Sequence, residues 1–107
     1  RRFVADDRQV SGWQALLAPL SLLDRGVLRI VAAGLPPFGQ EAMDRLRDTL
    51  GTRPTLAKVR SALTRLRRAG LVRTIARSTV IEDPLLAEYL STLTLDSAKR
   101  RQQHRSA

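Results

Sequence analysis

The spacing of apolar residues between positions 55 and 70 predicts a helix with one apolar side. These positions recur at intervals of three and four, as one stripe of a helix requires: Leu56, Val59, Leu63 and Leu66. Thr55 suits the N-cap, because its hydroxyl can accept from the amides of the first turn, and Gly70 suits the left-handed position beyond the end. The opposite side carries cationic and hydroxyl side chains, with two more arginines at its boundary: Lys58, Ser61, Thr64, Arg65 and Arg68, then Arg60 and Arg67.

Two helices are predicted before this stretch. Ser21 and Asp24 stand in the S-x-x-D relation of a capping box, and the helix that they open should end near Gly34, because two prolines follow. Its apolar stripe is Leu23, Val27, Ile30, Val31 and Gly34, flanked by Leu22, Leu28 and Leu35. Gly26 within it would allow a neighbouring element to approach closely. The other predicted helix spans 40–50 and ends at Gly51; its apolar positions are Ala42, Met43, Leu46 and Leu50.

After Gly70 the period changes to that of strands. Residues 71–76 and 79–81 are rich in β-branched side chains, so we expect a hairpin with Arg77-Ser78 as its turn. A two-residue turn prefers residues that tolerate positive φ, which this pair does not, so we expect the hairpin to be short, strained or wider than this. Asp83 and Pro84 suit the N-cap and first position of another helix. Its expected buried stripe is Leu85, Leu86, Tyr89, Leu90 and Leu93.

The two ends of the chain have weaker patterns. Residues 1–10 lack periodicity and are interpreted as an arm, and 9–18 predict a short helix that Pro19 interrupts. The apolar side of that helix is Val10, Trp13, Leu16 and Leu17, with Trp13 expected to pack it onto the domain. The basic stretch 94–107 is expected to be a disordered tail.

Positive charge is concentrated around the helix at 55–70. The net charge is +9, yet residues 1–48 carry seven Lys/Arg against six Asp/Glu. Residues 49–81 carry eight basic residues and no acid, 82–98 carry four acids and no base, and the tail adds four more cations. A surface that served only solubility would intersperse the signs, so this clustering favours a phosphate-binding surface.

Composition limits the alternatives. The 107 residues, 43% of them hydrophobic, suit one small domain. The absence of cysteine excludes disulfides and thiolate zinc sites, and a lone His104 makes no metal site. No apolar run approaches the roughly 20 residues that span a bilayer, so we expect a cytoplasmic protein without a membrane partner. We also expect no cofactor. Because the sequence opens on Arg1-Arg2, it is expected to be a piece of a longer protein.

The order of these elements, with helix, glycine-containing turn and helix at its centre, resembles the winged helix-turn-helix fold. The run VRSALTRLRRAGLVRTIARSTVIEDPLLAEYL, residues 59–90, carries the resemblance. Its end, a strand followed by Asp83-Pro84 and an apolar helix, is similar to the C-terminal winged helix of AAA+ and STAND-type ATPases. The resemblance implies a mostly α fold with a small β-hairpin, over about residues 21–93, preceded by 1–20 as arm and short helix.

This resemblance implies binding of double-stranded DNA, with 55–69 as the recognition helix of a prokaryotic transcriptional regulator or of a larger protein's DNA-binding appendage. Residues near the start of such a helix reach base edges, which makes Thr55, Lys58 and Ser61 candidates. Arg65 is expected at a base or the backbone, and Thr64 lies on the same side. Phosphate contacts are assigned to Arg53, Arg68, Arg73 and Arg77.

Other hypotheses remain open at this point. The domain could instead pack on an ATPase domain in its parent chain, and the acids at Glu82, Asp83 and Glu88 would suit such a protein partner. RNA binding is disfavoured by the scarcity of aromatic residues. An enzyme is the weakest hypothesis, because no catalytic constellation is present. A homodimer could form through 9–19 or the last helix, although no heptad run supports it.

Overall fold

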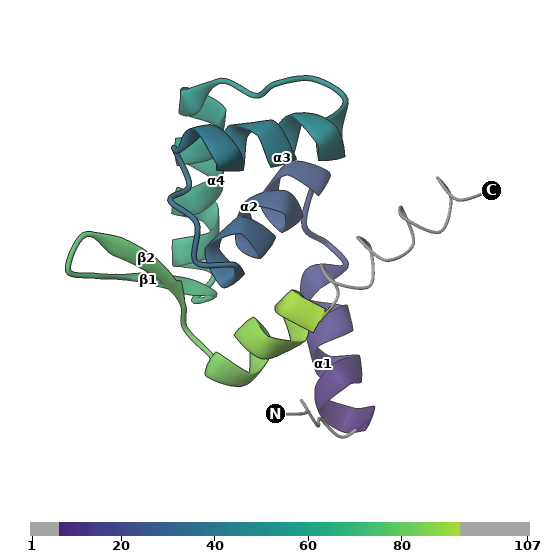
Figure 1. The fold of residues 1–107 in the computed structure, drawn as a ribbon. Coiled ribbons are helices and arrows are strands. Elements are labelled where there is room, and N and C mark those ends of the chain that lie inside the picture. The colour runs from purple at the N-terminus through teal and green to yellow at the C-terminus, as the bar shows by residue number, and fades with distance from the viewer. Residues whose placement is uncertain (1–6, 93–107) are drawn as a thin grey trace.

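The computed structural model describes residues 7–92, which form five helices and one two-stranded antiparallel sheet (Figure 1). The elements are α1 (Asp7–Leu17), α2 (Leu22–Ala32), α3 (Gln40–Leu50), α4 (Leu56–Arg68), β1 (Val72–Ile75) and β2 (Ser78–Ile81). A last helix over 84–92 follows β2. The predicted class, mostly α with a small β-hairpin, is confirmed. None of the helices within residues 7–92 is long and apolar enough to cross a membrane.

The core lies between α2, α3 and α4. In Figure 1 these helices form one group, the hairpin projects from it to the left, and α1 lies beside the last helix below it. Six side chains are almost fully buried and come from four helices: Val27, Leu28, Leu46, Val59, Leu66 and Leu86. All six belong to a single hydrophobic cluster. One core therefore holds every helix that positions α4.

The predicted helix caps are confirmed. The Ser21 hydroxyl accepts from the Asp24 amide at 3.1 Å, and the Thr55 hydroxyl accepts from the Lys58 amide at 3.2 Å. The Asp83 carboxylate accepts from the Leu85 amide at 3.0 Å. These bonds satisfy amides that have no partner within their own helix, which is why Ser, Thr and Asp favour these positions.

Four leucines assigned to apolar stripes or their flanks are exposed instead; one is Leu16 near the end of α1, at 43%, and the other three lie where helices begin. Leu22, Leu56 and Leu85 have exposed fractions of 50%, 52% and 43%. Each lies in the first turn of its helix, where Cβ points toward the helix N-terminus and so beyond the packed part of the stripe. Leu28, predicted as a flank, is in contrast fully buried. Leu93 and the tail 94–107 lie outside the described residues.

The first helix also differs from the prediction. It is helical from Asp7 rather than Gln9, and it ends at Leu17 rather than Ala18. An acidic residue such as Asp7 suits the first turn of a helix, where the macrodipole is positive. Trp13 packs as expected: it is buried, and its ring centroid lies 5.1 Å from that of Tyr89 in the last helix.

The hairpin turns one position earlier than predicted. Its register pairs Val72 with Ile81 and Ile75 with Ser78, which leaves Ala76-Arg77 rather than Arg77-Ser78 as the turn. Both turn residues have positive φ, 48° and 70°. Two-residue hairpin turns need this geometry to match the twist of the strands, and non-glycine residues adopt it at a cost. The expected strain is therefore present, at a neighbouring pair.

Candidate nucleic-acid interface

The faces of α4 divide clearly into buried and solvent-facing ones. Its buried side consists of Val59, Ala62, Leu63 and Leu66. None of its 13 residues is acidic, and its last turn carries arginines, which suit the negative end of the helix dipole. The helix ends at Arg68 with Ala69 as its C-cap, and Gly70 follows with φ of 77°. The result is a helix fixed by its apolar side whose remaining sides are basic.

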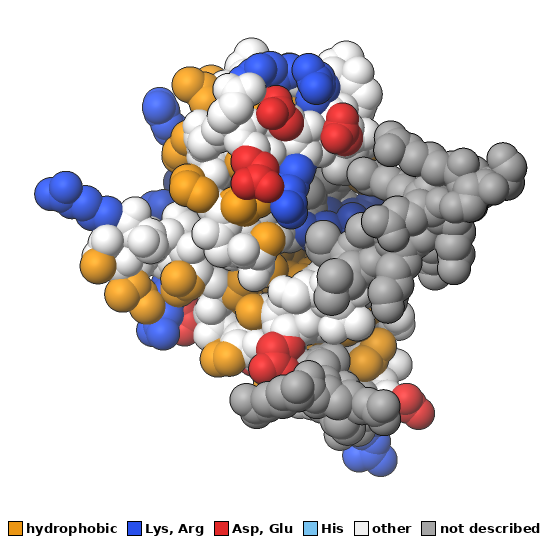
Figure 2. Space-filling model, in the orientation of Figure 1, with side chains coloured by type: hydrophobic (Ala, Val, Ile, Leu, Met, Phe, Trp, Pro, Cys, Tyr) orange, Lys and Arg blue, Asp and Glu red, His pale blue; other side chains and the backbone are white. Residues whose placement is uncertain are grey.

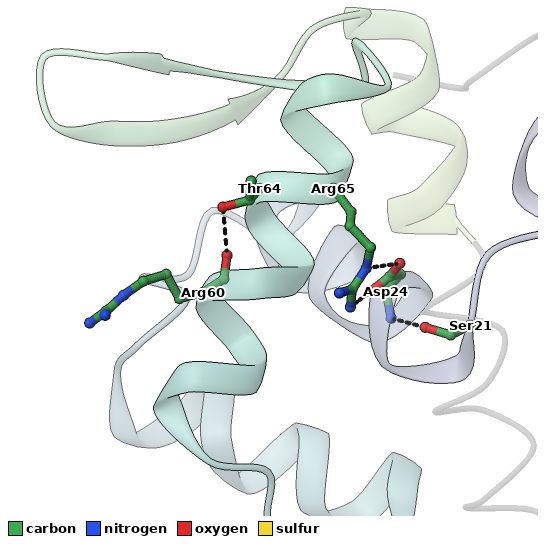
Figure 3. A network of polar contacts seen from close by, with 5 residues as sticks. All are labelled: Ser21, Asp24, Arg60, Thr64 and Arg65. Atoms are coloured by element: carbon green, nitrogen blue, oxygen red, sulfur yellow. Dashed lines mark hydrogen bonds and ion pairs between the residues drawn. The ribbon is translucent and has the colours of Figure 1, made fainter.

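Arg65 does not face outward with the other cations of α4. Its guanidinium donates two hydrogen bonds to the Asp24 carboxylate, at 3.0 and 2.7 Å (Figure 3). The Asp24 side chain is only 7% exposed, whereas that of Arg65 is 53% exposed. The hydrogen bond to Asp24 raises the pKa of Arg65 above its ordinary high value, so Arg65 keeps its positive charge. Arg65 therefore joins α4 to α2 through this ion pair.

Arg60 and Thr64 lie on the other flank of α4. Figure 3 shows the Arg60 side chain pointing away from α2, on the side from which the hairpin extends. The Thr64 hydroxyl donates to the Arg60 carbonyl oxygen at 3.1 Å. The sequence pattern predicts Arg60 only at the boundary of the basic side and not among the candidate residues. Its helical spacing from Thr64 was the signal that would have included it.

The remaining polar candidates of α4 are exposed as predicted: Lys58, Ser61 and Arg68, together with Arg67. The ion pairs found among residues 7–92 use Arg45, Arg65 and Arg73, so these other cations face solvent without an acidic partner. Lys58 precedes Arg65 by about two turns and lies on the same flank. The cations of α4 are therefore spread over the sides of the helix that face away from the core.

Three of the candidate arginines lie outside α4. Arg53, in the turn before it, donates to the Gln40 side-chain carbonyl at 3.4 Å. Arg73 on β1 is 3.6 Å from the Glu82 carboxylate, so part of its charge is compensated. Arg77 is exposed at the hairpin turn. A Lys or Arg side chain extends from the free end of the hairpin at the left of Figure 2, beside hydrophobic side chains.

Two of the three acids predicted to suit a protein partner have local roles. Glu82 pairs with Arg73, and Asp83 caps the last helix. Tyr89 is 9% exposed and belongs to the core. On α3, Arg45 and Glu41 form an exposed pair at 3.2 Å, and the face at the top of Figure 2 shows red and blue side chains together. Mixed charge on α3 contrasts with the acid-free α4.

No protein-family model, curated protein or solved structure matches the chain. Within residues 7–92, no group of three or more His, Cys, Asp or Glu side chains could hold a metal ion. The geometry and charge of α4 are therefore the basis for inferring what this helix contacts.

Proposed function

We propose that the chain is a winged helix-turn-helix module that binds double-stranded DNA, with α4 in the major groove. The observation that carries this proposal is an acid-free helix whose solvent sides carry uncompensated cations, beside a projecting hairpin. At 13 residues α4 is about 20 Å long, and the B-DNA major groove is wide enough to admit a helix. The pair α3–α4 supplies the helix-turn-helix and β1–β2 the wing.

The cations have distinct expected roles. Arg53, Arg68 and Arg77 lie at the turn before α4, at its end and at the hairpin turn, which spreads them along the surface that would follow the DNA backbone. Contacts of this kind supply affinity and register. Arg73 contributes less, because Glu82 competes for it. Arg65 acts within the protein, through Asp24.

Fluorescence anisotropy with a labelled duplex of random sequence tests the proposal. We expect binding at low salt whose log affinity falls linearly with log salt, with a slope of about 0.9 per phosphate contacted. Arg68→Ala should lower that slope by about one contact. Arg8→Ala on α1, at the far side of the molecule from α4, is the matched control and should leave it unchanged.

Equal effects of Arg68→Ala and Arg8→Ala would contradict α4 as the helix that contacts DNA. Absence of duplex binding at low salt by folded protein would contradict DNA binding and favour the alternative of a module that packs on an ATPase domain of its parent chain. The resemblance of 59–90 to such domains supports that alternative, while the local roles of Glu82 and Asp83 count against it.

A further inference from the structure

We infer that Arg60 selects guanine, through a bidentate contact from α4 in the major groove. This inference rests on the proposed DNA binding and adds the base class and the residue that recognises it. It concerns a side chain that the pattern of the sequence left outside the candidate set.

The position of Arg60 on α4 favours a base contact. It is the one arginine in the first two turns of the helix, Leu56–Arg68, and the N-terminal part of a recognition helix is the part that reaches base edges. Figure 3 shows its side chain extended from the flank on the hairpin side. A duplex held by both α4 and the hairpin would meet this flank.

The chemistry of the neighbouring side chains leaves guanine recognition to Arg60. Guanine presents two acceptors in the major groove, O6 and N7, which the planar guanidinium fork fits with two parallel hydrogen bonds. Lys58 has a point charge without that fork, and it lies on the flank of Arg65. Ser61 offers a single hydroxyl proton. No ion pair occupies Arg60 among the described residues.

Thr64 is excluded as a guanine donor by its own hydrogen bond. A carbonyl oxygen only accepts, so the bond to the Arg60 carbonyl commits the Thr64 hydroxyl proton to the backbone. The side chain retains its methyl group and oxygen lone pairs, neither of which bonds O6 or N7. Thr64 and Arg60 are one turn apart, about 6 Å along the axis, so both reach the same or adjacent base pairs.

The experiment selects duplexes from a random pool with the whole chain, and then measures anisotropy for the selected duplex and for versions with each base pair exchanged. The selected duplex should contain a G·C pair whose exchange for A·T weakens wild-type binding by about tenfold or more. Arg60→Lys keeps the charge and loses the planar fork, so it should weaken that discrimination with an unchanged salt slope. Arg60→Gln should lose the discrimination.

Two matched variants complete the test. Thr64→Val removes the hydroxyl with little change of shape and should retain the guanine discrimination. Arg67→Lys makes the same exchange as Arg60→Lys about two turns further along, at an exposed arginine with no assigned DNA contact, and should retain it too. Circular dichroism confirms that each variant is folded, which its exposed position favours.

The outcomes separate this inference from the proposed function. Salt-dependent duplex binding with guanine discrimination that survives Arg60→Lys and Arg60→Gln would overturn the role of Arg60 and leave DNA binding intact. Loss of discrimination in Thr64→Val would assign it to the hydroxyl and also overturn the inference. Absence of any duplex binding would overturn both.

Discussion

Asp24 and Arg65 form an ion pair whose two side chains differ in burial. The carboxylate is almost fully buried and the guanidinium is half exposed. Loss of the arginine would leave a buried charge without a partner, while loss of the acid would leave an arginine that turns into water. The Asp24 hydrogen bond raises the pKa of Arg65, so its stabilising effect is fully present below the unfolded-state pKa and is lost only in strong alkali.

This asymmetry predicts the order of stability of three variants. Arg65→Ala should lower the free energy of unfolding by about 2 kcal/mol, and Asp24→Ala by about 1 kcal/mol or less. The double variant should resemble Asp24→Ala, because the buried charge is then absent. Urea unfolding at neutral pH measures all three, provided their m-values agree. An Asp24→Ala variant at least as unstable as Arg65→Ala would contradict this account.

At the scale of single residues, the sequence predicts features that depend on neighbouring residues and misses contacts between residues far apart in the chain. Ser21, Thr55 and Asp83 cap helices that begin beside them, so their identity was sufficient. The contact between Asp24 and Arg65 joins residues 41 positions apart, and nothing near either one in the chain indicates it. Thr55–Arg68 could therefore be identified as a basic helix, but which of its arginines is turned inward could not.

Among the elements, the hairpin and the helix ends show the limits of periodicity. Ala76 and Arg77 adopt positive φ although neither is glycine or asparagine, so the turn carries no residue signal and was placed one position late. Leu56 and Leu85 satisfy the helical spacing, yet they lie in first turns that extend past the core. A stripe of apolar residues predicts a helix and which of its sides faces the core. How many residues of that stripe are buried depends on how far the element packed against it extends.

Gly26 on α2 allows α2 and α3 to pack closely together. A Cβ at Gly26 would lie 2.9 Å from Cδ2 of Leu46, which is 1% exposed. Replacement by alanine gains about 1 kcal/mol of helix propensity, and overpacking costs typically 1–3 kcal/mol. We expect Gly26→Ala to be destabilising on balance, because Leu46 is almost fully buried and would have to shift within a packed core.

The sign of that effect should reverse when the clash is removed. Leu46→Ala alone should cost about 2–5 kcal/mol through the cavity that it leaves. In that background the added methyl group fills space and the propensity gain remains, so Gly26→Ala should then be stabilising. Thermal unfolding of the four proteins of this cycle checks the prediction. The same sign of the Gly26→Ala effect in both backgrounds would show that the close approach is not what keeps the glycine.

For the molecule as a whole, the question is whether α1 and the last helix belong to the same cooperative unit as α2–α4. Trp13 and Leu17 on α1 belong to the same buried cluster as Leu86 and Leu90 on the last helix. The rings of Trp13 and Tyr89, tilted by 30° with centroids 5.1 Å apart, contact each other and join the two elements directly. A continuous core across all five described helices favours a single transition.

Trp13 is the only tryptophan, so its fluorescence reports α1 while far-ultraviolet circular dichroism reports all helices. We expect the two urea transitions to coincide. Leu17→Ala should move both together by about 2–3 kcal/mol, because Leu17 is buried, whereas Leu16→Ala, at an exposed neighbour, should move them by less than about 0.5 kcal/mol. A fluorescence transition that precedes the dichroism transition, or that alone responds to Leu17→Ala, would show that α1 undocks before the core unfolds. In that event α1 could separate from the last helix while α4 stays folded and presents its basic surface.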